Sequence, residues 1–358
     1  MSNRSFLIQL ILTLTVAILT SFLLTPSVKR LAYKIGAIDV PKDNRRMHRA
    51  PVPRLGGLAI FGGFLLATLL FAEISVQLRG ILIGSLLIVA LGVADDIYAL
   101  PALPKLVVQI AAALVAALHG NVIQFLSNPN IFSAASYVDL GWLSLPITLI
   151  WIVAITNAVN FIDGLDGLAV GVSAISTAAM LAIALLASEG QVTLVLAALL
   201  GGCIGFMPYN LNPAKIFMGD TGATFLGYIM ACLSIHGLFK FYAIISFAIP
   251  FLILGVPIFD ICFAIIRRLA HGQNPMQADR GHVHHRLIDM GFDQKQSVAI
   301  TYMLTAILGL SAVVLATSGE LRALVLIGAV LFVGGVGVYL ITAKKSDADA
   351  SDHEGESE

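Results

Sequence analysis

The feature that most constrains this chain is a series of long apolar runs separated by short polar connections. A helix that crosses a bilayer needs about 20 mostly apolar residues, so these runs predict an all-α, polytopic membrane protein with about 11 transmembrane helices. We expect several helices to continue past the first charge into the polar motifs. The predicted spans are Phe6–Leu24, Leu55–Ala72, Gly80–Ala94, Leu106–His119, Trp142–Val159, Leu168–Ala187, Val192–Met207, Gly222–Ile235, Phe241–Ile266, Val298–Ala316 and Leu321–Ile341.

Composition supports a lipid environment. Hydrophobic residues make up 58% of the chain and charged residues 12%, whereas soluble domains have roughly 25% charged residues. The net charge is zero, which argues against nucleic acid as a partner. The first apolar run is longer than a signal peptide core and basic residues follow it, so we expect a retained helix. The cysteines, which lie inside apolar runs, are expected to be packing residues: Cys203, Cys232 and Cys262.

Lysine and arginine predict the orientation, because they concentrate in cytoplasmic connections. When the connections are sorted by parity, nearly all of the 21 basic residues fall on one side. We therefore expect an outside N-terminus and a cytoplasmic C-terminus, with the polar motifs on the cytoplasmic face of the inner (plasma) membrane. The exceptions on the other side are Arg4, Arg79, Lys240 and Arg322.

The connections predict a single domain. Residues 1–345 form the transmembrane unit, and 346–358 are an acidic tail that we expect to be disordered. The outer connection Gly120–Gly141 predicts a small β-hairpin, and the inner side has two long loops, Thr25–Arg54 and Arg267–Ser297. No internal repeat is seen, which weighs against a transporter built from matching halves.

Two carboxylate motifs fall at predicted helix ends on the inner side. Asp95 and Asp96 end the third span; they are either a solvated helix end or groups that reach a shared site. In the run 157–167, Asn157, Asn160 and Asp163 recur every three residues and line one helix face. Asp166 follows, and no basic residue lies among them. The run is either a capped helix–turn–helix or a set of ligands for a metal or substrate.

Three further motifs lie on the same side. Asn210 precedes Asp220, which either caps the next helix or offers a carboxylate oxygen to a cation such as Mg²⁺. Residues 279–286 combine histidines with arginines, which suits an oligophosphate better than zinc because no cysteine lies nearby. A basic run in the first inner loop is either a positive-inside signal or a lipid-phosphate site; its candidates are Arg45, Arg46 and Arg49.

The motifs together resemble one family. Arg54–Gly57, Asp95–Asp96, Asn157–Gly167, Phe217–Gly222 and His282–Arg286 occur in the order and spacing of the polyprenyl-phosphate N-acetylhexosamine-1-phosphate transferases. The resemblance covers nearly the whole chain and is greatest to the WecA/TagO type, which primes O-antigen, common antigen or teichoic acid synthesis. Val283 interrupts the histidine run that is typical of phospho-MurNAc-pentapeptide transferases, which favours UDP-GlcNAc as the donor.

The resemblance implies transfer of GlcNAc-1-phosphate from UDP-GlcNAc to undecaprenyl phosphate, with release of UMP and a requirement for Mg²⁺ or Mn²⁺. It matches Asp95 and Asp96 to the catalytic carboxylates, and Asp220 and Asn160 to metal ligands. It matches Asp166 to a position near the uracil and Asn210 to an active-site amide. The positions that it matches to the sugar and diphosphate are Lys105, His282, His284, His285 and Arg286.

Several alternatives stay open at this point. The same chemistry could use another UDP-sugar, such as UDP-GalNAc, a bacillosamine derivative or UDP-MurNAc-pentapeptide. A transporter is disfavoured because the polar residues sit at one membrane edge, with Asp260 as the one doubtful case. The sequence does not decide between single and double displacement, or between a monomer and a homodimer.

Overall fold

A bundle of long apolar helices makes up most of the chain. The computed structural model describes residues 3–40, 51–127, 137–238, 248–270, 272, 282–318 and 327. The helices are α1 (Asn3–Ile35), α2 (Gly57–Phe71), α3 (Val76–Tyr98), α4 (Ala102–Leu118), α5 (Ser144–Phe161), α6 (Leu168–Leu186), α7 (Gly190–Asn210), α8 (Gly219–Leu233), α9 (Ala248–Ile253), α10 (Gly255–Ala270), α11 (Val283–Asp289) and α12 (Gln294–Ser318), with the short turns η1 (Gly141–Leu143) and η2 (Ser234–Leu238).

The first eight predicted spans correspond to helices α1 to α8. As expected, α3, α5 and α7 continue into polar motifs and carry Asp95, Asn160 and Asn210 in their last turns. By length and composition, α1, α3, α5, α6, α7 and α12 can each cross a membrane, while α2 and α4 are shorter apolar helices. The chain is therefore a helical, multi-pass membrane protein. The eleventh predicted span, apart from residue 327, and the acidic tail lie outside the described residues.

Two predicted boundaries were wrong. The ninth span was expected to be one helix, but the chain forms α9 and α10 with Leu254 between them. Pro257 explains the break, since proline cannot donate to the carbonyl of Ile253 and its ring crowds that group. The first inner loop was expected from Thr25, but α1 continues through Pro26 to Ile35 while packing against α2 and α7.

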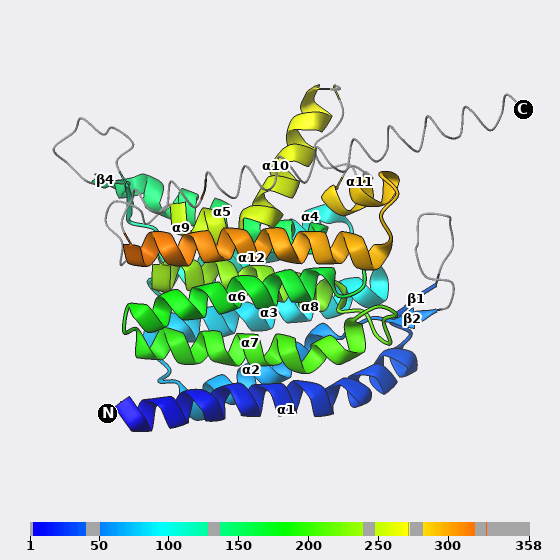
Figure 1. Cartoon of the computed structure of the whole chain (residues 1–358), viewed down its shortest axis with the longest axis horizontal. Helices are drawn as coiled ribbons and strands as arrows, with labels where there is room; N and C mark the ends of the chain where they lie inside the picture. Colours follow the sequence, from blue (N-terminus) through cyan, green and yellow to red (C-terminus); the bar gives the residue numbers. More distant parts are fainter. Residues whose placement is uncertain are drawn as a thin grey trace, which may run out of the picture.

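The helices lie side by side around α8 (Figure 1), which packs against α2, α3, α5 and α6. Apart from Asp220, every residue of α8 is buried. In contrast, α10 leans away from the bundle and carries exposed apolar side chains such as Phe259 and Ile266. The central helix therefore has a dry environment except at its first turn.

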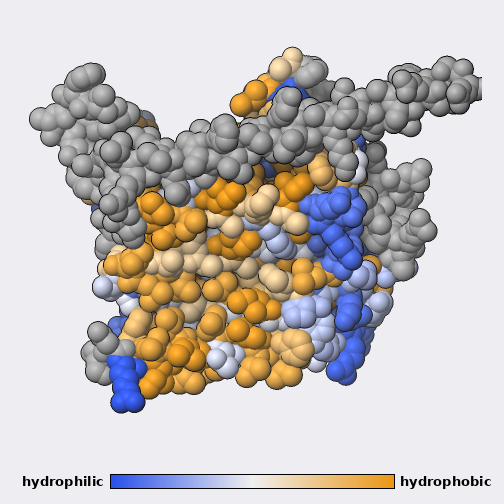
Figure 2. Space-filling model, in the orientation of Figure 1, coloured by the Kyte–Doolittle hydropathy of each residue, from blue (hydrophilic) through white to orange (hydrophobic). Residues whose placement is uncertain are grey.

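The two ends of the bundle differ. One end carries two-stranded antiparallel pairing between β1 (Ile38–Asp39) and β2 (Val52–Pro53), together with α11 (Figure 1). We call this the polar end, because Figure 2 shows hydrophilic residues gathered there beside a broad apolar face. The predicted outer hairpin is confirmed as β3 (Phe125–Ser127) paired with β4 (Tyr137–Asp139). The β1–β2 pair was not predicted.

Helix α2 meets α8 at a contact that requires glycine. A Cβ built on Gly57 would overlap the backbone of Gly222, and the N–H of Gly57 donates to the carbonyl of Met218 at 2.9 Å. The contact fixes the start of α8 beside the start of α2, with backbone against backbone.

We predict that Gly57→Ala lowers the stability of the folded protein by about 1–3 kcal/mol, the usual cost of overpacking. Gly62→Ala on the same helix is the matched control, because its Cβ would meet only the flexible end of the Leu24 side chain. Thermal unfolding of both variants in detergent checks this. Equal unfolding temperatures for the two variants would contradict the role of the Gly57 contact.

Candidate active site

Four carboxylates from three parts of the chain meet at the polar end. Asp95 and Asp96 lie in the last turn of α3, and Asp220 lies in the first turn of α8. Asp163 lies in the turn between α5 and α6. Because α8 packs against both α3 and α5, groups that are distant in sequence come together at the exposed start of the central helix.

Lys105 of α4 joins two of these carboxylates. Its Nζ lies 2.7 Å from Oδ2 of Asp95 and 3.3 Å from Oδ2 of Asp220. The other oxygen of Asp95 accepts the N–H of Leu100 at 2.7 Å. The lysine is 28% exposed and Asp95 is 6% exposed, so the ammonium group lies at the opening of the cluster and the carboxylate lies behind it.

Asp96 has a different environment from its neighbour. Its Oδ1 accepts the N–H of Asp220 at 3.0 Å, and its Oδ2 accepts the N–H of Thr221 at 3.1 Å and the Thr221 hydroxyl at 2.7 Å. A carboxylate at this position satisfies the free donors of a helix start and its positive dipole end. The alternative in which Asp220 caps α8 is therefore wrong, because Asp96 of α3 provides the cap.

The cluster carries an excess of negative charge. Loss of hydration and the charges of Asp220 and Asp96 raise the pKa of Asp163 to about 8, although Arg54 acts in the opposite direction. Groups of like charge that are held together disfavour ionisation unless a cation joins them. The arrangement therefore has the electrostatics of a site that binds a cation.

Arg54 is a basic residue at this site that was not among the predicted site residues. Its guanidinium lies 3.5 Å from Asp39 and is 34% exposed. The flanking backbone is held against the segment before α8, because the carbonyl of Pro53 accepts the N–H of Phe217 at 2.8 Å and Gly56 donates to Phe217 at 2.9 Å. The β1–β2 pair thus brings Arg54 to the carboxylates, whereas Arg45, Arg46 and Arg49 lie outside the described residues.

The donor set fits a sparsely bound hard cation. Among the described residues, no group of three or more His, Cys, Asp and Glu side chains forms a ready-made cage. Mg²⁺ commonly takes one or two carboxylates and completes its shell with water and substrate phosphates. Asp220 is 28% exposed, and Asn160 at the end of α5 is half-buried and makes no described side-chain hydrogen bond. Both can offer oxygens to such an ion.

The other two predicted amides make hydrogen bonds within the protein. Asn157 exchanges hydrogen bonds with Gln109 of α4, at 2.7 Å and 3.3 Å. Asn210 is buried and donates to the carbonyl of Ile216 at 3.0 Å, which closes the loop that leads to α8. Gln109 was not predicted, since nothing in the sequence around it distinguishes it from other polar residues in an apolar helix.

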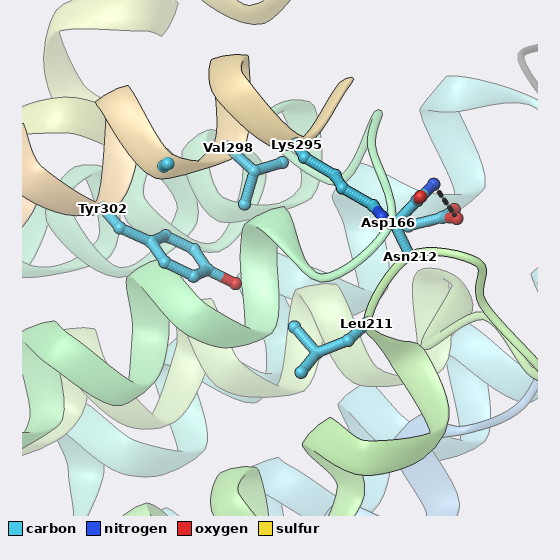
Figure 3. A pocket seen from close by; sticks show the side chains of 7 residues that line it. Asp166, Leu211, Asn212, Lys295, Val298 and Tyr302 are labelled. Carbon is cyan, nitrogen blue, oxygen red and sulfur yellow. Dashed lines mark hydrogen bonds between the residues drawn. The ribbon is translucent and has the colours of Figure 1, made fainter. Parts of the chain in front are cut away.

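Asp166 belongs to a hydrogen-bond network that joins the turn after α5, the loop after α7 and the start of α12 (Figure 3). Its Oδ2 accepts hydrogen bonds from Asn212 and from the N–H of Ala214, both at 3.0 Å, and Asn212 also donates to Gln294 at the start of α12. A cavity of about 240 Å³ lies beside it. Its lining residues are Asp166, Leu211, Asn212, Lys295, Val298, Ala299 and Tyr302.

The histidine motif forms the short helix α11 rather than an extended loop. His282 lies with its ring 5.7 Å from that of Phe161, and His284 packs where a side chain on Gly164 would stand. Burial and the charge of His285 lower the pKa of His284 to about 3, so this imidazole is neutral at physiological pH. Arg286 is exposed and lies over the ring of Phe263, 4.9 Å from its centroid. The motif thus lies over the turn that follows Asn160.

Comparison with known proteins agrees with this arrangement. Residues 78–238 match the model of glycosyl transferase family 4. The chain is 43% identical over 314 residues to a probable undecaprenyl-phosphate N-acetylglucosaminyl 1-phosphate transferase of Bacillus subtilis, covering 86% of each chain. It is 34% identical to a decaprenyl-phosphate N-acetylglucosaminephosphotransferase of Mycobacterium tuberculosis, covering 84% of this chain and 80% of that one. It is 30% identical to an undecaprenyl-phosphate alpha-N-acetylglucosaminyl 1-phosphate transferase of Yersinia pestis, covering 80% and 79%.

The capping role of Asp96 can be tested through stability. An amide has one acceptor oxygen where the carboxylate has two, so Asp96→Asn leaves at least one buried donor unmatched. We predict a loss of about 1–3 kcal/mol, measured by thermal unfolding in detergent. Asp139→Asn makes the same charge change at an exposed carboxylate whose bond from Gly141 an amide oxygen can still accept. An Asp96→Asn protein as stable as this control would contradict the cap.

Proposed function

Because the chain belongs to glycosyl transferase family 4, we propose that it transfers GlcNAc-1-phosphate from UDP-GlcNAc to undecaprenyl phosphate. The products are undecaprenyl-diphospho-GlcNAc and UMP, and the reaction primes a cell-surface polysaccharide. The names of the relatives support undecaprenyl phosphate as the acceptor and N-acetylglucosaminyl 1-phosphate as the group transferred. The observation that carries the proposal is the cluster of Asp95, Lys105, Asp163 and Asp220 at one end of an apolar bundle, where a lipid phosphate and a soluble diphosphate can meet.

The chemistry requires positioning and neutralisation of charge. We propose a single displacement in which an oxygen of the lipid phosphate forms a bond to the β-phosphorus of UDP-GlcNAc. The bond from that phosphorus to the bridging oxygen breaks, and the electron pair leaves with UMP. A phosphate monoester has a second pKa near 6, so most of the acceptor is already deprotonated at neutral pH.

We assign different roles to the two adjacent carboxylates. Asp96 uses both oxygens to hold the start of α8, so it supports the site. Asp95 is next to the ammonium group of Lys105 and is the better candidate to orient the attacking phosphate. Lys105 can turn from the carboxylates to the diphosphate, whose negative charge it offsets. An aspartyl-phosphate on Asp95 is the alternative that a trapped intermediate would reveal.

A divalent cation completes the proposal. Asp220 and Asn160 would hold Mg²⁺ or Mn²⁺, and the ion would supply positive charge that offsets the negative charge developing during transfer. The carboxylates gathered around Asp163 support this assignment, as does the Asn160 amide, which makes no side-chain hydrogen bond to the described residues. The uridine would lie toward Asp166, and the sugar-diphosphate toward α11.

We also propose the membrane arrangement that the basic residues predict. The polar end would face the cytoplasm, where UDP-sugars are made, with eleven spans in the inner membrane and the N-terminus outside. The described basic residues at the polar end, such as Lys29, Arg54 and Lys105, support this orientation.

The activity can be measured directly. Purified protein in detergent, given UDP-GlcNAc, undecaprenyl phosphate and Mg²⁺, is expected to form lipid-linked GlcNAc and equimolar UMP. A transporter would need a closed vesicle and would form no product. UDP-GalNAc and UDP-MurNAc-pentapeptide in the same assay are expected to give little product. Preferred use of either would replace the proposed donor and keep the reaction class.

The metal assignment predicts a specific loss in one variant. Asp220→Ala should lower kcat by at least about 100-fold, because metal stabilisation of the transition state amounts to several kcal/mol. It should also abolish the Mn²⁺ binding that electron paramagnetic resonance detects in the wild type. The control is Asp289→Ala, an exposed carboxylate on α11. Mn²⁺ binding that survives in Asp220→Ala would remove this residue from the metal site.

A further inference from the structure

Asp260 is a buried carboxylate for which the proposed reaction has no role. It lies in α10 and is 1% exposed. Its Oδ2 lies 2.7 Å from Nδ1 of His282, and its Oδ1 accepts the N–H of Val283 at 2.7 Å. A buried charge is costly unless it is paired and hydrogen-bonded. Both oxygens of Asp260 meet this need through contacts between α10 and the start of α11.

The contact with His282 determines which ring nitrogen carries the proton. An ionised carboxylate can only accept hydrogen bonds, so Nδ1 must be the donor. Nε2 is then the nitrogen that is left for a ligand, and it makes no hydrogen bond among the described residues. Carboxylate partners orient imidazoles in this way at other functional sites.

The place of His282 connects this pair to the site. Its ring packs against Phe161, the residue that follows Asn160. It also stacks on His284 with an interplanar angle of 5°, and His284 itself packs against Gly164 of the carboxylate-bearing turn. A change in the orientation of His282 would therefore occur beside the proposed position of the sugar-diphosphate.

We propose that Asp260 is a positioning residue that keeps Nδ1–H of His282 bound to it, so that Nε2, which takes up a proton from solvent when the anionic ligand binds, donates to the diphosphate of UDP-GlcNAc. This inference rests on the proposed function. The negative charge of Asp260 compensates the imidazolium that forms when His282 meets an anionic ligand. His284 cannot take this part because it is neutral and its Nε2 is enclosed without a partner.

A simpler role would be to cap α11 through the N–H of Val283. Asp260→Asn separates the two roles, since the amide oxygen can still accept that N–H. The NH₂ group of the new asparagine then faces Nδ1 of His282, so Nδ1 must become the acceptor. The ring proton moves to Nε2, and the negative charge that compensated a charged imidazole is lost. The variant thus keeps the size of the side chain and the cap while it changes the state of the imidazole.

The test measures the equilibrium binding of UDP-GlcNAc by calorimetry with Mg²⁺ and full-length protein in detergent. Asp260→Asn is expected to raise Kd at least about tenfold, which corresponds to roughly 1.4 kcal/mol. The KM for undecaprenyl phosphate should not change. Asp289→Asn at the exposed end of α11 is the matched control and should leave Kd unchanged.

A double-mutant cycle decides whether the effect passes through His282. In a His282→Ala background, Asp260→Asn should change Kd by less than about twofold. An equal loss in both backgrounds, or no loss in the wild-type background, would overturn the proposal. A wild type that binds no UDP-GlcNAc would instead refute the proposed function itself.

A direct measurement reads the wild type itself and needs a His282 variant only to assign the signal. Nitrogen-15 NMR of histidine-labelled wild type, assigned by comparison with His282→Ala, or with His282→Gln where the alanine variant is unstable, should show a proton on Nδ1 of His282. An unprotonated Nδ1 would overturn the inference.

Discussion

The site depends on how the first turn of α8 is held against the last turn of α3. Apart from Asp220, every residue of α8 is buried, so its free N–H groups have little access to water. Asp96 accepts two of them and the Thr221 hydroxyl as well. Without these bonds the helix start would leave unmatched donors in a dry region, which costs about 1–3 kcal/mol for each group. The hydrogen bonds of Asp96 that stabilise the start of α8 therefore also fix the position of Asp220.

The same junction explains the charge balance of the site. Asp96 has its charge matched by helix donors, and Asp95 is matched by Lys105. Asp220 shares Lys105 with Asp95. Loss of hydration and the charges of Asp220 and Asp96 raise the pKa of Asp163. Two anionic substrates would add further negative charge, which cations such as Lys105 and Arg54 and the proposed divalent metal ion would offset.

The sequence predicted the helices well where an apolar run was long and uninterrupted. It also predicted that Asp95, Asn160, Asp163 and Asp220 lie on one side of the membrane. That prediction needs only the number of spans between them along the chain. The cap by Asp96 was not predicted, since it joins residues about 124 positions apart. The exchange between Gln109 and Asn157 depends in the same way on how α4 packs against α5.

Other differences between the predicted and the observed structure have local causes that the spacing of apolar residues does not reveal. Pro257 interrupts a run whose hydropathy is continuous, so α9 and α10 were joined in the prediction. The β1–β2 pair is two residues long on each side, too short for a strand pattern, yet it brings Arg54 to the site. Asp260 was noted as a polar residue in an apolar run, but its partner His282 could be identified only from the packing of α10 against α11.

The distribution of polar groups along the helices argues for catalysis over transport. An ion pathway needs ionisable or coordinating groups through the depth of the membrane. Here several hydroxyls within the helices bond to the backbone of their own helix, as Thr156 does to Ile152 and Thr305 to Thr301. The carboxylates that cluster together, Asp95, Asp96, Asp163 and Asp220, lie at the polar end. Asp260 contacts His282 and accepts the N–H of Val283 at the start of α11, at that same end. These contacts explain a carboxylate within α10 without a pathway across the bilayer.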